Sequence, residues 1–183
     1  MNRPVSLCVL REKNGMNRVF PDPQTMKQFC FQEAAMELKK LTVQDRGIIT
    51  DLFKDVFTHE PWNDDWSDLE QLNAYIADLT GQSNSLTLGY FDAGRLAGLA
   101  MGYIKHWHAG TEYVIDEFCI DRQMQGQGIG GSFLKAIEAY LAENRIYRIF
   151  LQTENDVPAY RFYQRHGFQE LTGHVSFSKT IGE

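Results

Sequence analysis

A glycine-rich stretch, RQMQGQGIGG at residues 122–131, is the part of this 183-residue sequence whose composition points most directly to chemistry. It holds four glycines and no acidic residue, and it lies between an apolar run, EYVIDEFCI, and an amphipathic run, SFLKAIEAYLAEN. That order predicts a helix beginning after a strand. The first N–H groups of a helix are unpaired and lie at the positive end of its dipole. Glycines let such groups turn inward around a phosphate, so the stretch is a candidate phosphate-binding loop.

The same glycines have two competing interpretations. A flexible turn would also use them. Alternatively, Gly126, Gly128 and Gly131 match the dinucleotide-binding pattern G-x-G-x-x-G, and Glu154 follows at about the distance that pattern requires. In that motif, however, the first glycine follows its strand closely and opens a large parallel sheet. Here residues 121–125 intervene and only 29 residues follow Glu154, so the context disfavours a dinucleotide site.

The elements that position the stretch follow from hydrophobic periodicity and turn signals. Thr42 and Ser67 are expected as helix N-caps, and Glu70 would complete a capping box with Ser67. Pro158 suits the first turn of a last helix, which Gly167 would end. The pattern predicts strands at 37–41, 86–91, 95–107, 112–120 and 147–153, a closing pair of strands within 168–180, and helices at 42–58, 67–79, 129–143 and 158–167. This order predicts a mixed α/β domain.

Two motifs resemble those of one family. Residues 125–130, Gln-Gly-Gln-Gly-Ile-Gly, resemble the loop with which the GCN5-related N-acetyltransferases (the GNAT family) hold coenzyme A. Residues 155–168, NDVPAYRFYQRHGF, resemble the family's second signature at Asn155, Ala159, Phe162, Tyr163, Gly167 and Phe168. The resemblance covers about residues 37–180. It implies the GNAT fold, an α/β fold whose central, mostly antiparallel sheet splays between its fourth and fifth strands and is flanked by helices.

The resemblance also implies how acetyl-CoA, the expected cosubstrate, would bind. The pantetheine arm would fill the gap of the splayed sheet, against backbone groups of Phe118, Cys119 and Ile120. Asn155 would hydrogen-bond the arm from the other side, and Tyr163 would reach the thioester sulfur. The diphosphate would lie against Gln125, Gly126, Gln127, Gly128, Ile129 and Gly130. No metal is expected, because His106 and His108 have no evident third ligand.

Acetyl transfer to an amine sets three chemical demands. A carboxylate must accept a proton from the amine, and Asp116 or Glu117 can do so. Neighbouring strand residues face opposite ways, so we expect only one of them to face the acetyl group, and we favour Glu117. The Ile120 N–H would stabilise the oxyanion, and Tyr163 would protonate the leaving thiolate. We interpret Cys119 as a buried apolar residue, so transfer should be direct, within a ternary complex.

The loop between the first two helices, THEPWNDDWSD at residues 58–68, would bind the acceptor. Trp62, Asp64, Asp65 and Trp66 offer aromatic faces and carboxylates, which suit a polycation. The loop resembles that of aminoglycoside 6′-N-acetyltransferases, so the expected acceptor is a cationic small molecule, aminoglycoside-like or polyamine-like. Acetylation of protein or peptide amines and a non-catalytic acyl-CoA sensor are the alternatives. A solvated acidic loop would look the same in sequence.

Composition limits the possible partners and the cellular location. The net charge is −6, and residues 1–35 carry five basic and three acidic side chains, which leaves −8 on residues 36–183. An acidic body disfavours nucleic acid as a partner. There is no apolar run of about 18 residues, so no membrane partner is expected. Three widely spaced cysteines indicate neither disulfides nor zinc and favour the cytoplasm.

Two further expectations concern organisation. Residues 1–35 show no clear periodicity and are interpreted as an N-terminal extension, loosely ordered, before a GNAT domain at residues 36–183. Many relatives dimerise through their last strands, so HVSFSKT at residues 174–180 makes a homodimer possible.

Overall fold

The computed structural model describes residues 7–10, 18–21 and 36–182, and the chain divides into two compact units, Met1–Ala35 and Met36–Glu183. In the first unit, β1 (Leu7–Leu10) pairs antiparallel with β2 (Arg18–Pro21). The prediction that residues 1–35 are loosely ordered concerns, apart from these two strands, residues outside the described ranges. Across the described ranges, no helix has the length and apolar character that crossing a membrane requires.

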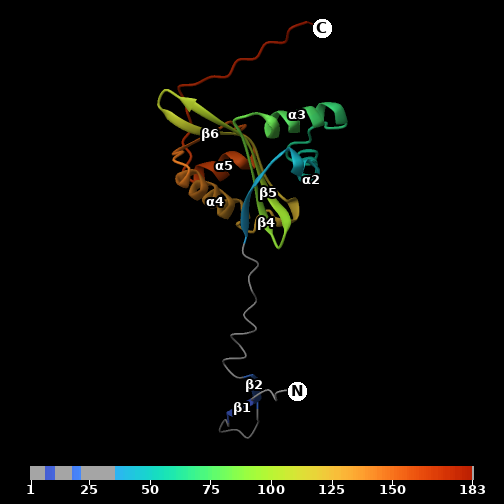
Figure 1. Ribbon diagram of the computed structural model, residues 1–183, viewed down its shortest axis with the longest axis vertical. Coiled ribbons are helices and arrows are strands. Elements are labelled where there is room, and N and C mark those ends of the chain that lie inside the picture. The colour runs from blue at the N-terminus through green and yellow to red at the C-terminus, as the bar shows by residue number, and fades with distance from the viewer. Residues whose placement is uncertain (1–6, 11–17, 22–35, 183) are drawn as a thin grey trace. The chain divides into compact units, whose positions relative to one another are not determined.

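The second unit is built on a five-stranded sheet in the order β3-β4-β5-β6-β7 (Figure 1). The first four strands pair antiparallel, and the last pairs parallel with β6. Their bounds are β3 Glu37–Leu41, β4 Ser85–Asp92, β5 Arg95–Trp107, β6 Gly110–Ile120 and β7 Arg148–Leu151. The predicted mixed fold with a mostly antiparallel sheet is therefore confirmed.

The sheet opens between its fourth and fifth strands, β6 and β7. Their pairing runs only from Glu112↔Arg148 to Ile115↔Leu151, whereas β6 continues to Ile120. Among the strands that the structure describes, none lies beside one edge of residues 116–120. This is the splay expected of the sheet, and it leaves an edge with unpaired backbone groups next to the glycine loop.

Helices cover both faces of the sheet (Figure 1). On one face, α2 (Arg46–Phe57) and α3 (Leu69–Gly81) bury apolar side chains such as Phe53 and Ile76 in a core that also contains Cys119. On the other face, α4 (Ile129–Glu143) buries Phe133 and Ile137 in a second core. The last helix, α5 (Pro158–Arg165), begins with its proline in the first turn, as predicted.

The helix starts follow local capping chemistry, with one correction. Thr42 forms a capping box with Asp45 and opens a 3-10 turn, Val43–Asp45, that leads into α2. The expected Ser67 cap is wrong. Asp68 caps α3 instead, because its carboxylate accepts from the N–H groups of both Glu70 and Gln71 at 2.9 and 3.1 Å. A carboxylate at this position also suits the positive end of the helix dipole.

The expected closing strands within residues 168–180 are also wrong, because the structure contains no strand there. Val175 and Phe177 are 75% and 93% exposed, so the alternating apolar side chains that suggested a strand cover no core in the single chain. The segment touches the body through Gln152, whose Nε2 donates to the Ser176 hydroxyl at 2.8 Å. A two-residue period needs a partner strand and a surface to cover, and here it has neither.

A β-bulge in β6 changes which face of the sheet the side chains after residue 116 point toward. Met101 pairs with Glu117 and Gly102 with Ile115, so Asp116 is the extra residue. Ile115 packs in the core beneath α4, whereas Cys119 packs in the core beneath α2 and α3. Residues an even number of positions apart would otherwise share a face. The bulge reverses this alternation and turns Glu117 toward α3.

The bulge depends on a glycine opposite it. A Cβ at Gly102 would lie 1.9 Å from the backbone oxygen of Val114, which cannot move without disturbing the sheet. We expect Gly102→Ala to lower the free energy of unfolding by about 2 kcal/mol or more, as overpacking against a fixed neighbour does. Urea denaturation measures this change.

Gly47→Ala is the matched control. Gly47 is an exposed residue in α2, and a Cβ added to it would meet nothing within 4 Å, so the same substitution should stabilise by about 0.5–1 kcal/mol. Equal effects of the two substitutions would contradict the close approach at the bulge.

Candidate active site

Glu117 lies at the centre of the candidate site, half-buried between the sheet and α3. Its Oε1 accepts a 2.5 Å hydrogen bond from the hydroxyl of Tyr75 on α3. Burial raises the pKa of Glu117 to about 7, the Tyr75 hydrogen bond acts in the opposite direction, and the negative charges of Asp116 and Asp64 add to the rise. Glu117 is therefore a stronger base than an ordinary carboxylate and still ionises near neutral pH.

Tyr75 is a residue that the sequence analysis missed. It is 42 positions away from Glu117 in the chain and belongs to no motif. The only signal available was its place on α3 between Leu72 and Ile76, both buried, which predicts a residue near the sheet.

Asp116 also lies toward α3, which differs from the opposite facing expected of two successive strand residues. The expectation assumed a regular strand, and the bulge removes that regularity. Asp116 lines a hollow of about 160 Å³ together with Asp78, Leu79 and Gln82. It is the more exposed of the two acids, and partial burial raises its pKa.

Tyr163 and Cys119 lie buried beside the open edge of β6. The Tyr163 ring, on α5, contacts Phe118 edge-on with a centroid distance of 6.3 Å. Burial raises the pKa of the Tyr163 hydroxyl, with added effects of Cys119 and Glu117, so the phenol stays protonated. Burial likewise raises the pKa of Cys119 and keeps its thiol protonated, which does not suit a nucleophile.

The open edge of β6 presents backbone donors. Asp121 N–H donates to Ala97 O on β5 at 2.8 Å. Because hydrogen bonds alternate between the two sides of an antiparallel strand, the N–H groups of Phe118 and Ile120 point toward the open side. The carbonyl of Ile120 accepts from Gln125 Nε2 at 3.0 Å, which ties the glycine loop to the end of the strand.

The loop itself is ordered by side-chain hydrogen bonds. Asp121 caps a 3-10 turn, Arg122–Met124, by accepting from Gln123 N–H, and it forms an ion pair with Arg95. The side chain of Gln127 donates to the Gln123 carbonyl at 2.8 Å. These contacts stabilise the conformation of the loop.

The four glycines of the loop have two different roles. Gly126 and Gly128 have φ angles of 74° and 81°, and a Cβ on either would meet nothing within 4 Å. Gly128 is also the N-cap of α4 and supplies no side-chain cap, so the first N–H groups of the helix face open space. Gly130 and Gly131 instead allow α5 to pack closely, since a Cβ there would lie 3.2 Å from Phe162 and 2.7 Å from His166.

Two other predicted coenzyme contacts, Ile129 and Asn155, lie outside the turn itself. Ile129 is the first residue of α4 and packs partly against the core beneath that helix. Asn155 is exposed in the segment between β7 and α5, where its side chain is available to a ligand.

Of the predicted acceptor residues, the two tryptophans pack against other aromatic rings and the two aspartates contribute negative charge. Trp66 stacks on Tyr75 at 5.2 Å, and Trp62 packs on Phe57 at 5.8 Å, so both indoles are partly buried. Asp65 accepts hydrogen bonds from Ser67, which lower its pKa and order the loop. Asp64 is exposed, and its charge acts on Glu117.

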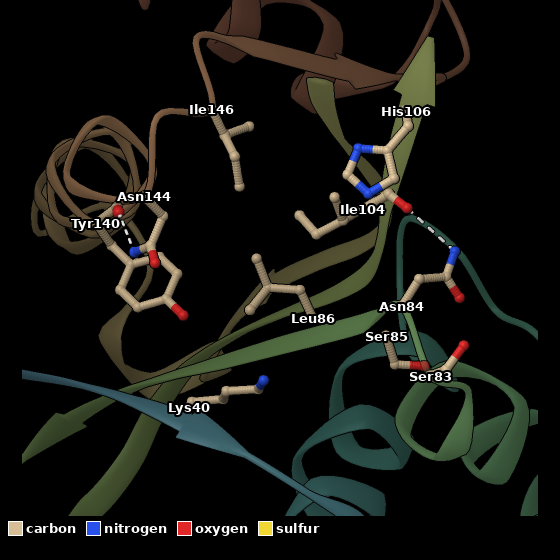
Figure 2. A pocket seen from close by; sticks show the side chains of 10 residues that line it. All are labelled: Lys40, Ser83, Asn84, Ser85, Leu86, Ile104, His106, Tyr140, Asn144 and Ile146. Carbon is tan, nitrogen blue, oxygen red and sulfur yellow. Dashed lines mark hydrogen bonds between the residues drawn. The ribbon is translucent and has the colours of Figure 1, made fainter. Parts of the chain in front are cut away.

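A larger cavity of about 270 Å³ lies elsewhere, near the end of α4 (Figure 2). Figure 2 shows Tyr140 and Asn144 of that helix on one side, with Lys40 of β3 and His106 of β5 around the same space. None of the predicted site residues lines it. The glycine loop is at the other end of α4, about 20 Å away for a helix of this length. Size alone therefore does not identify the active site.

Comparison with known proteins decides the family. Residues 47–168 match the Acetyltransferase (GNAT) family. The chain belongs to this family. It is also 31% identical over 150 residues to the spermine/spermidine N(1)-acetyltransferase of Bacillus subtilis (strain 168), a match that covers 79% of this chain and 93% of that relative. The GNAT resemblance of the two motifs is thereby confirmed, and the chain is an N-acetyltransferase of a family that uses acetyl-CoA.

Solved structures share the GNAT fold. An aminoglycoside acetyltransferase, meta-AAC0020, from an uncultured soil metagenomic sample in complex with sisomicin, superposes with a TM-score of 0.62 at 21% identity, over 80% of this chain and 97% of that one. The aminoglycoside N-acetyltransferase AAC(6′)-Iy in complex with CoA has a TM-score of 0.62 at 12% identity, over 80% and 95% of the two chains.

Acetyl-CoA fits the residues present, because the loop at Gly126 and Gly128 has open space and unpaired N–H groups where a diphosphate needs donors. The described residues do not offer a comparable site for a metal ion. Within the part of the chain that the structure describes, no group of three or more His, Cys, Asp or Glu side chains is arranged to hold an ion.

The glycine loop yields a direct test. Gly128→Ala should weaken the binding of coenzyme A about tenfold or more, because the methyl group narrows the approach to the first N–H groups of α4. Isothermal titration calorimetry measures the dissociation constant.

Gly110→Ala is the matched control. Gly110 also has a positive φ, 129°, and open space where a Cβ would lie, but it begins β6 at the end remote from the loop. It should show similar backbone strain and unchanged coenzyme affinity. Equal weakening in both variants would mean that strain, not the loop, sets the affinity.

Proposed function

We propose that this GNAT enzyme transfers the acetyl group of acetyl-CoA directly to a primary amine of a cationic small molecule, polyamine-like or aminoglycoside-like. The observation that carries the proposal is the half-buried Glu117 beside the open edge of β6, with the charges of Asp64 and Asp116 acting on it. The relative named for spermine and spermidine, and the structures named for aminoglycosides, support an acceptor that carries several amines.

The coenzyme would bind along the loop and the open edge. The N–H groups at Gly126, Gly128 and the start of α4 would hold the diphosphate. Gln125 ties the loop to β6, Gln127 bonds within the loop, and Gly130 lets α5 pack closely. The pantetheine arm would lie along residues 118–120, where Phe118 and Ile120 offer free N–H groups, and Asn155 would reach it from the other side.

Glu117 would accept the proton of the acceptor amine. An alkyl ammonium has a pKa near 10, so an ordinary carboxylate would be about six units too acidic, and the raised pKa of Glu117 reduces this gap to about three. The neutral nitrogen attacks the thioester carbon and a C–N bond forms; the nitrogen then loses its second proton to solvent and the C–S bond breaks. The Ile120 N–H would stabilise the oxyanion, and Tyr163 would give its proton to the departing thiolate and regain one from solvent.

The surrounding carboxylates would favour a polycation. Asp64, Asp65 and Asp116 are exposed near the α3 side of the site, and Asp78 shares a hollow with Asp116. Charged partners of this kind attract ammonium groups and raise their encounter rate. Trp62 and Trp66 present the partly exposed parts of their rings beside these acids.

Replacement of the base gives the first functional prediction. Glu117→Gln should lower kcat/KM for the acceptor by about 10²–10⁴-fold, the usual contribution of a general base. In the unmodified enzyme, kcat/KM should rise as pH increases through about 7, because only the ionised Glu117 can accept a proton. Release of free thiol from acetyl-CoA measures both quantities.

The substitution Asp116→Asn distinguishes the role of Asp116 from that of Glu117. It should keep most of the activity and move the acidic limb of the profile to lower pH, because the charge of Asp116 raises the pKa of Glu117. If Asp116→Asn abolished activity while Glu117→Gln retained it, the roles of the two residues would be reversed.

The acceptor class is tested by thiol release with spermidine, spermine, kanamycin and a short peptide. We expect turnover with at least one polycation and little with the peptide. Asp64→Asn should raise KM for the polycation several-fold with little change in kcat, because Asp64 is exposed and adds charge without contacting the reaction. Parallel double-reciprocal plots would contradict direct transfer, and coenzyme binding without turnover would favour the sensor alternative.

We also propose an organisation around this reaction. Residues 36–183 would form the catalytic domain of a cytoplasmic enzyme that needs neither nucleic acid nor membrane, and residues 1–35 would form an extension. The exposed alternating side chains of Val175, Phe177 and Ile181 would join two copies as a homodimer, since in one chain they cover nothing.

A further inference from the structure

We propose that Tyr75 is a positioning residue for Glu117: its hydroxyl holds one carboxylate oxygen in place, favours the ionised form, and leaves the other oxygen to receive the proton of the amine. The inference rests on the proposed role of Glu117 as the base. Tyr75 belongs to neither GNAT motif of this chain, and its role follows from the geometry between α3 and β6.

The hydrogen bond has the geometry of a charge-assisted contact. Tyr75 Oη lies 2.5 Å from Glu117 Oε1, at the short end of the range for a hydroxyl that donates to a carboxylate. The hydroxyl donates to Oε1 only, and within the described residues Oε2 accepts no hydrogen bond, so that oxygen can receive a proton. A fixed carboxylate with one free oxygen limits the directions from which an amine can be deprotonated.

The ring of Tyr75 is held by its neighbours. It stacks on Trp66 with a centroid distance of 5.2 Å and an interplanar angle of 23°. It also packs on Phe53 of α2 at 5.8 Å. One stacked and one tilted aromatic contact restrict the rotation of the phenol, which reduces the side-chain entropy lost when the hydroxyl bonds Glu117. Trp66 thereby contributes to the base through Tyr75, in addition to any contact with the acceptor.

The Tyr75 hydroxyl keeps its proton and acts as the hydrogen-bond donor to Glu117. Burial raises the pKa of Tyr75, and the hydrogen bond to Glu117 raises it further, so the hydroxyl stays protonated throughout the working range. Tyr75 therefore cannot remove a proton from Glu117 or from the amine. Its effect on catalysis must pass through the carboxylate.

Groups from several elements lie around Glu117: Tyr75 on α3, Asp64 in the loop before α3, Asp116 and Cys119 on β6, and Tyr163 on α5. Burial and the charges of Asp116 and Asp64 raise the pKa of Glu117, and the Tyr75 hydrogen bond is the contribution that lowers it. Loss of this bond should therefore leave Glu117 protonated at pH 7.

The test is Tyr75→Phe, which removes the hydroxyl and keeps the ring against Trp66 and Phe53. The pH profile of kcat/KM for the acceptor should keep its shape while its acidic limb moves up by about one pH unit. At pH 6.5 the variant should be about tenfold slower than the unmodified enzyme, and at pH 9 the two should agree within about threefold. A loss of equal size at every pH, or no change, would overturn the proposal.

Two controls distinguish positioning from general damage. Tyr147→Phe removes the hydroxyl of a residue that is 80% exposed, and it should leave the profile and the melting temperature unchanged. In a Glu117→Gln background, Tyr75→Phe should cause little further loss, because the hydroxyl acts through the carboxylate. Full additivity of the two substitutions would contradict this route.

The outcomes also separate this inference from the proposed function. If Glu117→Gln retained the pH profile of the unmodified enzyme, Glu117 would not be the base and both proposals would fall. If Glu117→Gln flattened the profile and Tyr75→Phe left the limb in place, only the role of Tyr75 would fall. Coenzyme affinity by calorimetry should be the same in Tyr75→Phe and the unmodified protein, since Tyr75 lies on the acceptor side.

Discussion

Opposite Gly102, strand β6 carries one residue more than β5, and the extra residue is Asp116. The bulge turns Glu117 from the core beneath α4 toward α3 and Tyr75. A glycine is required across from it, because any Cβ would overlap the Val114 carbonyl. The position of the proposed base therefore depends on a close approach of the β5 and β6 backbones. This approach sets the direction of Glu117, and the direction determines its hydrogen bond to Tyr75 and the burial that raises its pKa.

The end of the same strand would bind the coenzyme in the proposed mechanism. Because β7 pairs with β6 only as far as Ile115, the N–H groups of the next residues point into the gap. Gln125 ties the glycine loop to Ile120, so the loop is held at the end of the strand that carries Glu117. In the proposed mechanism, consecutive parts of β6 would position the coenzyme and the base, and the acceptor would meet them from the side of α3.

Much of this architecture could be predicted from local patterns. The alternation of apolar residues predicts β4, β5 and β6, and the glycines at 126 and 128 predict the helix start with its open donors. These features depend on neighbours in sequence, where periodicity and backbone freedom are visible. Gly130 and Gly131 look equivalent to them in sequence, but they serve the packing of α5 and do not face the open space.

What sequence reasoning missed involves contacts between distant segments. Gly102 resembles any other glycine in a strand, so the bulge and the resulting direction of Asp116 were not visible. Tyr75 meets Glu117 across 42 residues. At residues 168–180 the sequence predicted a strand that the structure lacks. The apolar residues around Phe177 alternate as in a strand, but none of the described strands pairs with them. Period alone does not supply a partner.

Amide hydrogen exchange with and without coenzyme A tests the central claim most directly. The account predicts that saturating coenzyme A protects the N–H groups of Phe118, Ile120 and the first turn of α4, while the hydrogen-bonded N–H groups on the β5 side of the same strand change little. Bound coenzyme A that leaves these amides as exchangeable as before, and protects amides around the cavity near Asn144 instead, would contradict it.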